Sequence, residues 1–595
     1  MDDAERQREE RRLERDRRRR ERGKPTHFEN APQPQAERDR GVLSELEAEA
    51  FDAEGLATQT GIGVPAPAVA QETPDTGKGL VRSGVIFAVA TGLSRIIGLA
   101  REIAQNIVFG TKGGPVNAFA LAFLIPNTVR ALVADSALSA AFVPIFSDLL
   151  VKGEAKRAWR VASSLFWLML LGLGGITALF VVIAPWVMGL FNYGPGQAYG
   201  MLAANLARIL FPIVIVLGLT GIVVGILNSY DHFTVPALTP IAWNAIILLG
   251  LGLGVQNSDL QSTRLYYYAV AILIATIVQF LLPLPWLRGR DDRLRMVIDI
   301  HDPAVKKTFV LMLPVAIGIG LINFNALVDQ LFASNLLDKT LAPASIVGAF
   351  RLYMLPQGVF SVAVATVLFP LLSRHASRED WDAFKRTVAT GLRLICFLLI
   401  PASAVAAVLA TPIVRLLYQH GKFDASQTKV VAPCLAAFAL GLTFNGTMLM
   451  LNRGFFSLQQ PWIPTLVALL NLGVNAGLDA VFYRFGIWGI PLSTSIVNIA
   501  GTWALIVLFR RRLGSFGMEE TARSFLYVCV ASAVLAAVAW WVWHGLDSAF
   551  GQSLAAQIIS LGGAFLLGGA AFFGACRLLG VRELETLSRL RRRAA

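Results

Sequence analysis

The chain is poor in charged residues and in the residues that enzymes most often use. Only 16% of its 595 residues are charged and 55% are hydrophobic, whereas a typical soluble protein has about 25% charged residues. Its four cysteines and six histidines form no Cys-x-x-Cys pair and no metal-binding cluster. No HExxH, GxSxG or P-loop motif occurs. These absences exclude an ordinary soluble protein and argue against a hydrolase or an ATP-driven pump.

Long apolar segments fill the chain from about residue 80 onward. Each is close to the roughly 20 residues that a bilayer-spanning helix needs. We therefore predict an all-α integral membrane protein with 14 transmembrane helices. The predicted segments are 82–108, 116–148, 160–190, 202–228, 234–254, 265–287, 307–335, 343–372, 388–417, 430–453, 461–483, 486–509, 521–545 and 553–579.

Basic residues gather in the two termini and in alternate loops. Residues 1–78 are highly charged and have too few apolar residues for a core, so we predict a disordered basic tail. Loops that follow even-numbered segments hold most of the remaining Lys and Arg, for example 152–160 and 288–295. By the positive-inside rule, the tail and the basic C-terminus, 581–595, are both cytoplasmic. Topology thus explains the net charge of +13, and we expect no nucleic-acid partner.

An internal repeat divides the apolar part of the chain. APWVMGLFNYG at 184–194 aligns with TPIVRLLYQHG at 411–421, and LGLT at 217–220 recurs at 440–443. The repeat predicts two parallel six-helix lobes, with the substrate site between them near the middle of the bilayer. We place the first lobe at 79–290 and the second at 291–512. The two helices of 513–580 fall outside the repeat.

Four arginines lie within the predicted membrane helices: Arg95, Arg101, Arg130 and Arg351. An arginine at the bilayer centre costs about 2.5–3.5 kcal/mol on insertion scales, so these side chains should line a wet cavity. Guanidinium groups there suit a phosphate-bearing cargo, because their planar fork binds oxygens bidentately. Glu102 is a local counter-charge. The alternatives are that Arg101 snorkels to an interface and that Arg351 opens its helix and reaches the extracytoplasmic headgroups.

Acidic, amide and hydroxyl side chains form a second candidate site. Asp329 lies in the seventh predicted segment, Asn475 and Asp479 lie four residues apart in the eleventh, and Thr494 lies in the twelfth. Such oxygen ligands suit a small cation such as Na⁺, and a carboxylate there suits a transported proton. The alternative is ordinary hydrogen bonding between helices, which contributes about 0.6 kcal/mol per bond.

The chain resembles the MurJ (MviN) lipid II flippases of the multidrug/oligosaccharidyl-lipid/polysaccharide exporter superfamily. The resemblance covers most of the chain after about residue 80, but not the tail. The motifs that carry it are SRIIGLARE (94–102), NAFALAFLIPNTVRALVADSALSAAFVPIF (117–146), LNSYDHFTVPALTPIAWN (227–244), RLYMLPQGVFSVAVATVLFPLLS (351–373) and YQHGKFDAS (418–426).

This resemblance implies roles for the candidate residues. The four arginines would engage the diphosphate and the sugar–peptide head of an undecaprenyl-linked precursor. The helices of 513–580 would form a groove for its isoprenoid tail. Asp329, Asn475 and Asp479 would bind sodium. The chain departs from the family at Asn117 and Met354, where relatives often carry acidic residues, and this puts in doubt any mechanism that uses those carboxylates as switches.

We therefore expect a transporter of the bacterial plasma (inner) membrane that flips the peptidoglycan precursor lipid II to the outer leaflet by alternating access. It would need no cofactor, and Na⁺, H⁺ or the membrane potential would bias the cycle. Its partners would be the lipid-linked substrate, membrane lipids and cell-wall synthesis machinery. The alternatives are a flippase or exporter for another lipid-linked oligosaccharide or an amphipathic solute, a membrane-bound glycan polymerase, and a scaffold for that machinery.

Overall fold

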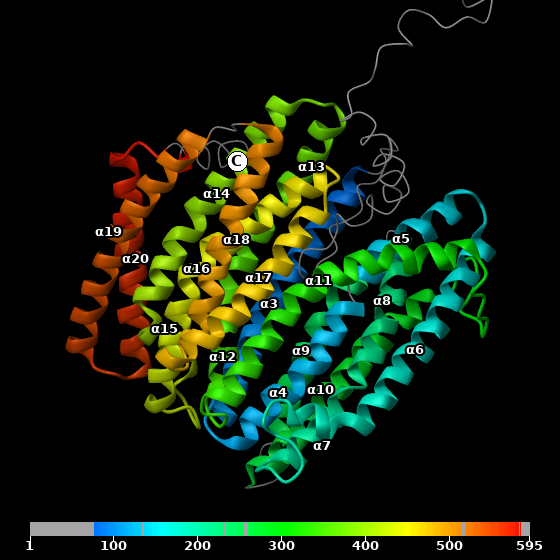
Figure 1. Cartoon of the computed structure of the whole chain (residues 1–595), viewed down its shortest axis with the longest axis horizontal. Coiled ribbons are helices and arrows are strands. Elements are labelled where there is room, and N and C mark those ends of the chain that lie inside the picture. The colour runs from blue at the N-terminus through cyan, green and yellow to red at the C-terminus, as the bar shows by residue number, and fades with distance from the viewer. Residues whose placement is uncertain are drawn as a thin grey trace, which may run out of the picture. The chain divides into compact units, whose positions relative to one another are not determined.

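The protein is helical throughout the part of the chain that the structure describes (Figure 1). The structure is a computed structural model that describes residues 77–133, 136–230, 232, 234–254, 260–514, 518–581 and 583–584, and for residues 77–92 it describes the backbone alone. Two predicted regions lie almost wholly outside the described residues. They are the tail predicted at 1–78, of which residues 1–76 are not described, and the basic C-terminus predicted at 581–595.

The helices are described in three groups along the chain. The first group is α3 (Gly77–Phe109), α4 (Gly114–Val133), α5 (Ser136–Val151), α6 (Ala155–Gly189), α7 (Gly200–Leu210), α8 (Ile213–Ser229), α9 (Thr234–Gly254), α10 (Gln261–Leu281) and the 3₁₀ turn η2 (Leu284–Leu287). The second is α11 (Pro303–Leu336), α12 (Ala342–Pro356), the π-helix η3 (Gln357–Ser361), α13 (Val362–Ser377), α14 (Trp381–Val408), α15 (Ala410–Tyr418), α16 (Ala425–Ser457), α17 (Trp462–Phe482), the 3₁₀ turn η4 (Tyr483–Phe485) and α18 (Gly489–Leu513). The third is α19 (Met518–Phe550) and α20 (Leu554–Leu578).

Ten helices of the described residues are long and apolar enough to cross a membrane. An all-helical membrane protein, as predicted, is therefore confirmed. The exact number of 14 spans and the parallel repeat stay predictions.

Proline explains why several predicted spans are each built from two helices. Pro212 has no N–H to donate, and it separates α7 from α8. Pro412 likewise cannot bond to the carbonyl of Val408, the last residue of α14, and α15 begins after Leu409. In the predicted eighth span, Pro356 precedes the five-residue π-helix η3. These spans bend at fixed points instead of running straight.

The first and second groups of helices each pack around an apolar core of their own. The first core is built around side chains such as Phe142, Trp159 and Phe211, and the second around Phe438 and Phe455, all of them fully buried. α11 packs both on α4 and α5 of the first group and on α17 of the second, so it connects them. α19 and α20 pack on each other and on α14 and α15, at one edge of Figure 1.

Candidate functional site

Arginines from both helix groups meet at one carboxylate. The Nη2 of Arg101, in α3, lies 2.7 Å from Glu102 Oε1, and the Nε of Arg351, in α12, lies 3.3 Å from the same oxygen. Arg101 and Glu102 are buried, whereas 41% of the Arg351 side chain is exposed. Glu102 therefore stands between two cationic groups, and one of them is accessible to a ligand.

Arg95 contacts the second helix group at η3, the π-helix that directly follows α12. A β-carbon placed on Gly358, in η3, would lie 2.5 Å from the Nη1 of Arg95. The guanidinium therefore rests against the backbone of the π-helix, where only glycine leaves room for it. π-helical turns are rare and recur at functional sites. The two arginines of α3 thus face neighbouring parts of the same partner, α12 and η3.

The structure contradicts the alternative for Arg101 and the helix-start position expected for Arg351. Arg101 is 7% exposed and stacks over the Trp243 ring, 4.9 Å from its centroid, so it does not reach out to an interface. The expectation that Arg351 opens its helix is wrong, because α12 begins at Ala342 and places Arg351 in its second half. A helix start cannot explain an arginine paired with Glu102 of another helix.

Arg130 is held within α4. Its Nε and Nη2 donate to Asn127 Oδ1 over 3.2 and 3.0 Å. The structure therefore places Arg95, Arg101 and Arg351 against α12 and η3 or within them, and it orients Arg130 through Asn127 of the same helix.

A buried amide links the two helix groups at one end. Asn117 Nδ2, in α4, donates to the carbonyl oxygens of Thr111, Gly113 and Thr340 over 3.0, 3.0 and 2.6 Å. Its Oδ1 accepts from the Ala344 amide of α12 over 2.8 Å. Asn117 is fully buried, and all its donors and acceptors face backbone groups. The sequence marked Asn117 only as a departure from the family and did not reveal this role.

Gln427, in α16, completes this connection. Its Oε1 accepts from the backbone amide and the hydroxyl of Thr111 and from the Lys112 amide, while its Nε2 donates to the Lys422 carbonyl over 2.8 Å. The Lys422 amide in turn donates to the Ile107 carbonyl over 2.8 Å. We call the contacts among residues 107–117, 340–344 and 421–427 the latch. It joins the first helix group to the second.

The predicted ion-site residues lie together inside the second group. Asn475 Nδ2 donates to Asp329 Oδ1 over 2.5 Å and to Asp479 Oδ2 over 3.2 Å. The Thr494 hydroxyl donates to Asp329 Oδ2 over 3.2 Å. Asp329, Asn475 and Asp479 are almost completely buried. Three helices, α11, α17 and α18, thus bring two carboxylates, an amide and a hydroxyl into one cluster.

The donor set of this cluster fits a hard cation. The Oδ1 atoms of Asn475 and Asp479 are buried and accept no hydrogen bond. Ordinary hydrogen bonding between helices therefore leaves two oxygen acceptors unsatisfied, which a cation or a proton would use. Among the described residues, no three His, Cys, Asp or Glu side chains are grouped so that they could hold a metal ion by themselves. The oxygen-only set suits Na⁺ better than a transition metal.

Sequence comparison finds relatives along most of the chain. The family model for "Lipid II flippase MurJ" matches residues 107–560. A probable lipid II flippase MurJ of Vibrio cholerae is 29% identical over 85% of this chain and 97% of its own length. The lipid II flippase MurJ of Burkholderia cenocepacia is 30% identical over 84% of this chain and 98% of its own length.

Solved structures give the same result. A lipid II flippase MurJ in an inward closed conformation aligns with a TM-score of 0.69 at 25% identity, covering 84% of this chain and 99% of that one. An inward-facing multidrug transporter of the MATE family aligns with a TM-score of 0.63 at 14% identity, which indicates a shared fold alone. With a family model matched over most of its length and relatives matched almost end to end, the chain belongs to the lipid II flippase MurJ family.

Proposed function

We propose that this protein moves lipid II from the cytoplasmic to the outer leaflet of the bacterial plasma membrane by alternating access. The observation that carries the proposal is the placement of Glu102 between Arg101 and Arg351, with Arg95 of the same helix against Gly358 of η3. A diphosphate offers several anionic oxygens, and guanidinium groups bind such oxygens with charge-assisted hydrogen bonds. Family membership supplies the cargo that carries this diphosphate.

Glu102 would make the binding reversible. Without ligand, its carboxylate neutralises part of the charge of Arg101 and Arg351. An arriving diphosphate competes for the accessible Arg351 guanidinium, and Glu102 takes it back when the head group leaves. A site with uncompensated arginines would bind more tightly and release more slowly. Translocation needs both steps and no covalent chemistry.

The latch would decide which side of the membrane the cavity faces. Loops with many basic residues, such as 152–160, lie at the chain ends of helices opposite to the latch loops. By the positive-inside rule the latch end is extracytoplasmic, so a closed latch would shut the cavity on the outer side of the membrane. Opening of the latch would release the head group outside. The lipid tail would stay in the membrane along α19 and α20 throughout.

The oxygen cluster would bias this cycle. Asp329 belongs to α11, which also packs on α4 and α5 of the first group. A Na⁺ ion or a proton bound by Asp329, Asn475 and Asp479 would therefore shift the position of α11 relative to both groups. The membrane potential is a further source of free energy for the cycle, about 2.3 kcal/mol per elementary charge moved across 100 mV.

Complementation tests the proposed function. A strain depleted of its own lipid II flippase should grow when it expresses this protein and should not grow with Arg95→Ala, Arg130→Ala or Arg351→Ala present at equal membrane levels. Rescue by the variants would contradict the arginine site. Failure of the wild type would favour the alternative, a flippase or exporter for another lipid-linked oligosaccharide or an amphipathic solute.

Thermal unfolding in detergent tests the ion. Sodium chloride should raise the melting temperature of the wild type more than an equal concentration of potassium or choline chloride, because a ligand that binds only the folded state stabilises it. Asp479→Asn should remove this difference, and Asp148→Asn, at an exposed carboxylate, should keep it. Equal effects of the three salts on the wild type would exclude a sodium site.

A further inference from the structure

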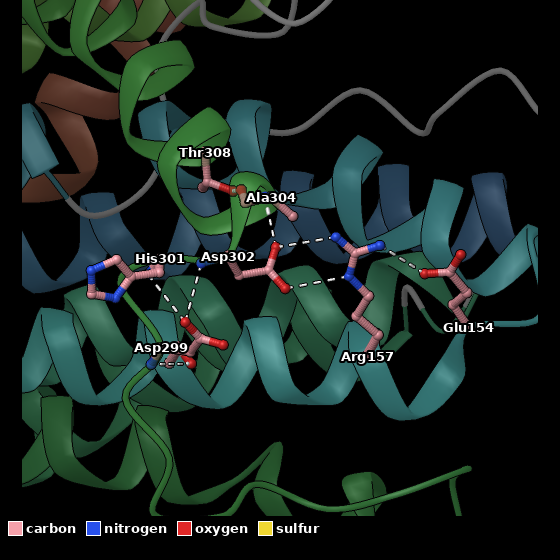
Figure 2. A network of polar contacts seen from close by, with 8 residues as sticks. Glu154, Arg157, Asp299, His301, Asp302, Ala304 and Thr308 are labelled. Carbon is pink, nitrogen blue, oxygen red and sulfur yellow. Dashed lines mark hydrogen bonds and ion pairs between the residues drawn. The ribbon is translucent and has the colours of Figure 1, made fainter.

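The segment that joins the two helix groups contacts the first group through acidic side chains near each of its ends. We call residues 288–302 the connecting segment. Tyr230 donates to Asp291 over 2.7 Å, and the Arg157 guanidinium pairs with Asp302 over 3.3 Å (Figure 2). Burial favours the neutral form of Asp302, but hydrogen bonds from Arg157 and from the Ala304 amide outweigh it and lower its pKa. These carboxylates therefore fix the segment in place.

The backbone of the connecting segment is bonded along α6. The amides of Arg295 and Asp299 donate to the hydroxyls of Ser163 and Ser164, each over 3.0 Å. Trp167 Nε1 donates to the Arg295 carbonyl over 2.9 Å. Two buried serines and one tryptophan thus hold this segment in an extended conformation against the helix.

Alternate side chains of the docked part point outward, and they are apolar. Met296 is 83% exposed and Ile298 and Ile300 are each 51% exposed, whereas Val297 and Asp299 between them are half-buried. This alternation follows from an extended backbone, in which successive side chains point to opposite sides. Exposed apolar surface costs about 25 cal/mol per Å² in water. Three such residues in a row indicate a nonaqueous neighbour.

Arginines at the start of the segment line a hollow. Among the described residues, no carboxylate lies within ion-pair distance of Arg288, Arg290 or Arg293, and Arg290 rests over the Tyr230 ring at 4.9 Å. These arginines line a surface cavity of about 430 Å³. Its other lining residues are Trp159, Leu287, Gly289, Asp292 and Leu294. The cavity therefore presents three guanidinium groups that have no ion-pair partner among the described residues, beside apolar side chains and the Asp292 carboxylate, which pairs with Arg295.

The segment lies at the depth of the membrane interface. Trp167, which anchors it, precedes Leu171 by one turn of α6, about 6 Å along the helix axis. Leu171 is 60% exposed and is followed by other exposed apolar residues, such as Leu179 and Val182, that form the lipid-facing side of α6. Trp286, just before the segment, is 44% exposed, and tryptophan is enriched at this depth.

We propose that the connecting segment binds an anionic phospholipid of the adjoining leaflet. Arg288, Arg290 and Arg293 receive the phosphate of its headgroup, and Met296, Ile298 and Ile300 insert among the acyl chains. Juxtaposed basic and apolar side chains are typical of surfaces that bind anionic membranes. A free phosphate would use the arginines but not the apolar row. Because the segment joins the two helix groups, a bound lipid would contact the link between them.

Lipid binding by the full-length protein in detergent tests this proposal, with bound phosphatidylglycerol counted by native mass spectrometry. The variant R288Q/R290Q/R293Q should bind the tightest phosphatidylglycerol about 100-fold more weakly, since each cationic side chain contributes about fivefold at an anionic surface. R510Q/R511Q/R512Q removes three basic residues at the end of α18 and should bind like the wild type. If the triple variant at 288–293 has a lowered melting temperature, R293Q alone, at an exposed residue, should still lose about fivefold.

Two outcomes would overturn the proposal. One is unchanged phosphatidylglycerol binding by a folded R288Q/R290Q/R293Q protein, and the other is displacement of the lipid by 10 mM inorganic phosphate, which would indicate a site for free anions. A nitroxide attached at Ile298→Cys in a Cys529→Ser background reports on the apolar row in vesicles of phosphatidylglycerol and phosphatidylcholine. It should be relaxed by oxygen more than by a water-soluble nickel complex, and the opposite ranking would contradict insertion.

Discussion

At the scale of single residues, the candidate site depends on close packing as much as on charge. Arg95 reaches the second helix group only because Gly358 has no side chain. A single carboxylate oxygen of Glu102, Oε1, contacts two guanidinium groups that belong to different helices. The contacts with Glu102 place Arg101 and Arg351 without leaving these guanidinium groups unpaired in an apolar surrounding.

Gly358→Ala should impair transport, though less than Arg95→Ala, because the flexible guanidinium must shift but is not removed. The added methyl group would occupy the position of the Arg95 guanidinium and displace it from η3, although Gly→Ala within a helix otherwise stabilises by about 0.5–1 kcal/mol. Complementation of a flippase-depleted strain measures the effect. Gly477→Ala is the control, because a β-carbon there meets no other atom within 4 Å, and it should complement fully. Full growth with Gly358→Ala would show that transport does not depend on the packing of the Arg95 guanidinium against Gly358.

Asn117→Asp should open the latch at neutral pH. An ionised carboxylate cannot donate to the three carbonyl oxygens that Asn117 Nδ2 now contacts, and each unsatisfied buried group costs about 1–3 kcal/mol. Spin labels at Lys112→Cys and Lys422→Cys, on opposite sides of the latch, should report longer distances in this variant. A lower pH should shorten them again by protonating the new carboxyl group. Identical distances in Asn117→Asp and wild type would remove Asn117 from the latch.

At the scale of helices, the last two are attached to the second group by a buried ion pair. Arg415 of α15 pairs with both carboxylate oxygens of Asp547 in α19, and its guanidinium also lies near Trp543. Only 10% of the Arg415 side chain and 18% of the Asp547 side chain are exposed. The ion pair therefore fixes the proposed path of the lipid tail relative to the arginine site.

Asp547→Asn should lower the stability of the protein by about 3 kcal/mol, because it leaves Arg415 as an unpaired buried charge. The melting temperature in detergent measures the loss. A double variant, Arg415→Met with Asp547→Met, should recover most of it, since apolar replacement of a buried pair is often neutral. Asp148→Asn breaks an exposed pair with Lys152 and should change stability by less than about 0.5 kcal/mol. Equal losses of stability in Asp547→Asn and Asp148→Asn would mean that the buried Arg415–Asp547 pair stabilises the protein no more than an exposed pair does.

At the scale of the whole molecule, the proposed cycle requires the two helix groups to separate at the latch. The latch consists of hydrogen bonds between helix ends and loops of the two groups. Its buried apolar side chains belong to one core or the other, for example Phe109 and Val116 to the first and Phe423 to the second. Opening of the latch would therefore break hydrogen bonds and leave both cores intact, since closely packed cores resist deformation.

A crosslink across the latch should stop transport. Lys112 and Lys422 are exposed, and the backbone of each bonds to the side-chain amide of Gln427. A short bis-methanethiosulfonate reagent can therefore join cysteines introduced at these two positions. Flipping should fall to background after reaction and return after reduction. Lys422→Cys with Lys429→Cys, both within the second group, is the control and should leave transport unaffected. Undiminished transport by the crosslinked protein would contradict alternating access through this end.

The sequence alone determined the membrane class, because runs of about 20 apolar residues have no other stable environment. It also indicated Arg95, Arg101 and Arg351, because charged residues are costly inside such runs, and the cluster of Asp329, Asn475 and Asp479, because of its four-residue spacing. Only the tertiary structure decided which groups meet. Glu102 receives an arginine from each helix group, Asn117 closes the latch, and residues 288–302 lie along α6. These contacts join residues far apart in the chain, and hydrophobicity and spacing within one segment carry no information about them.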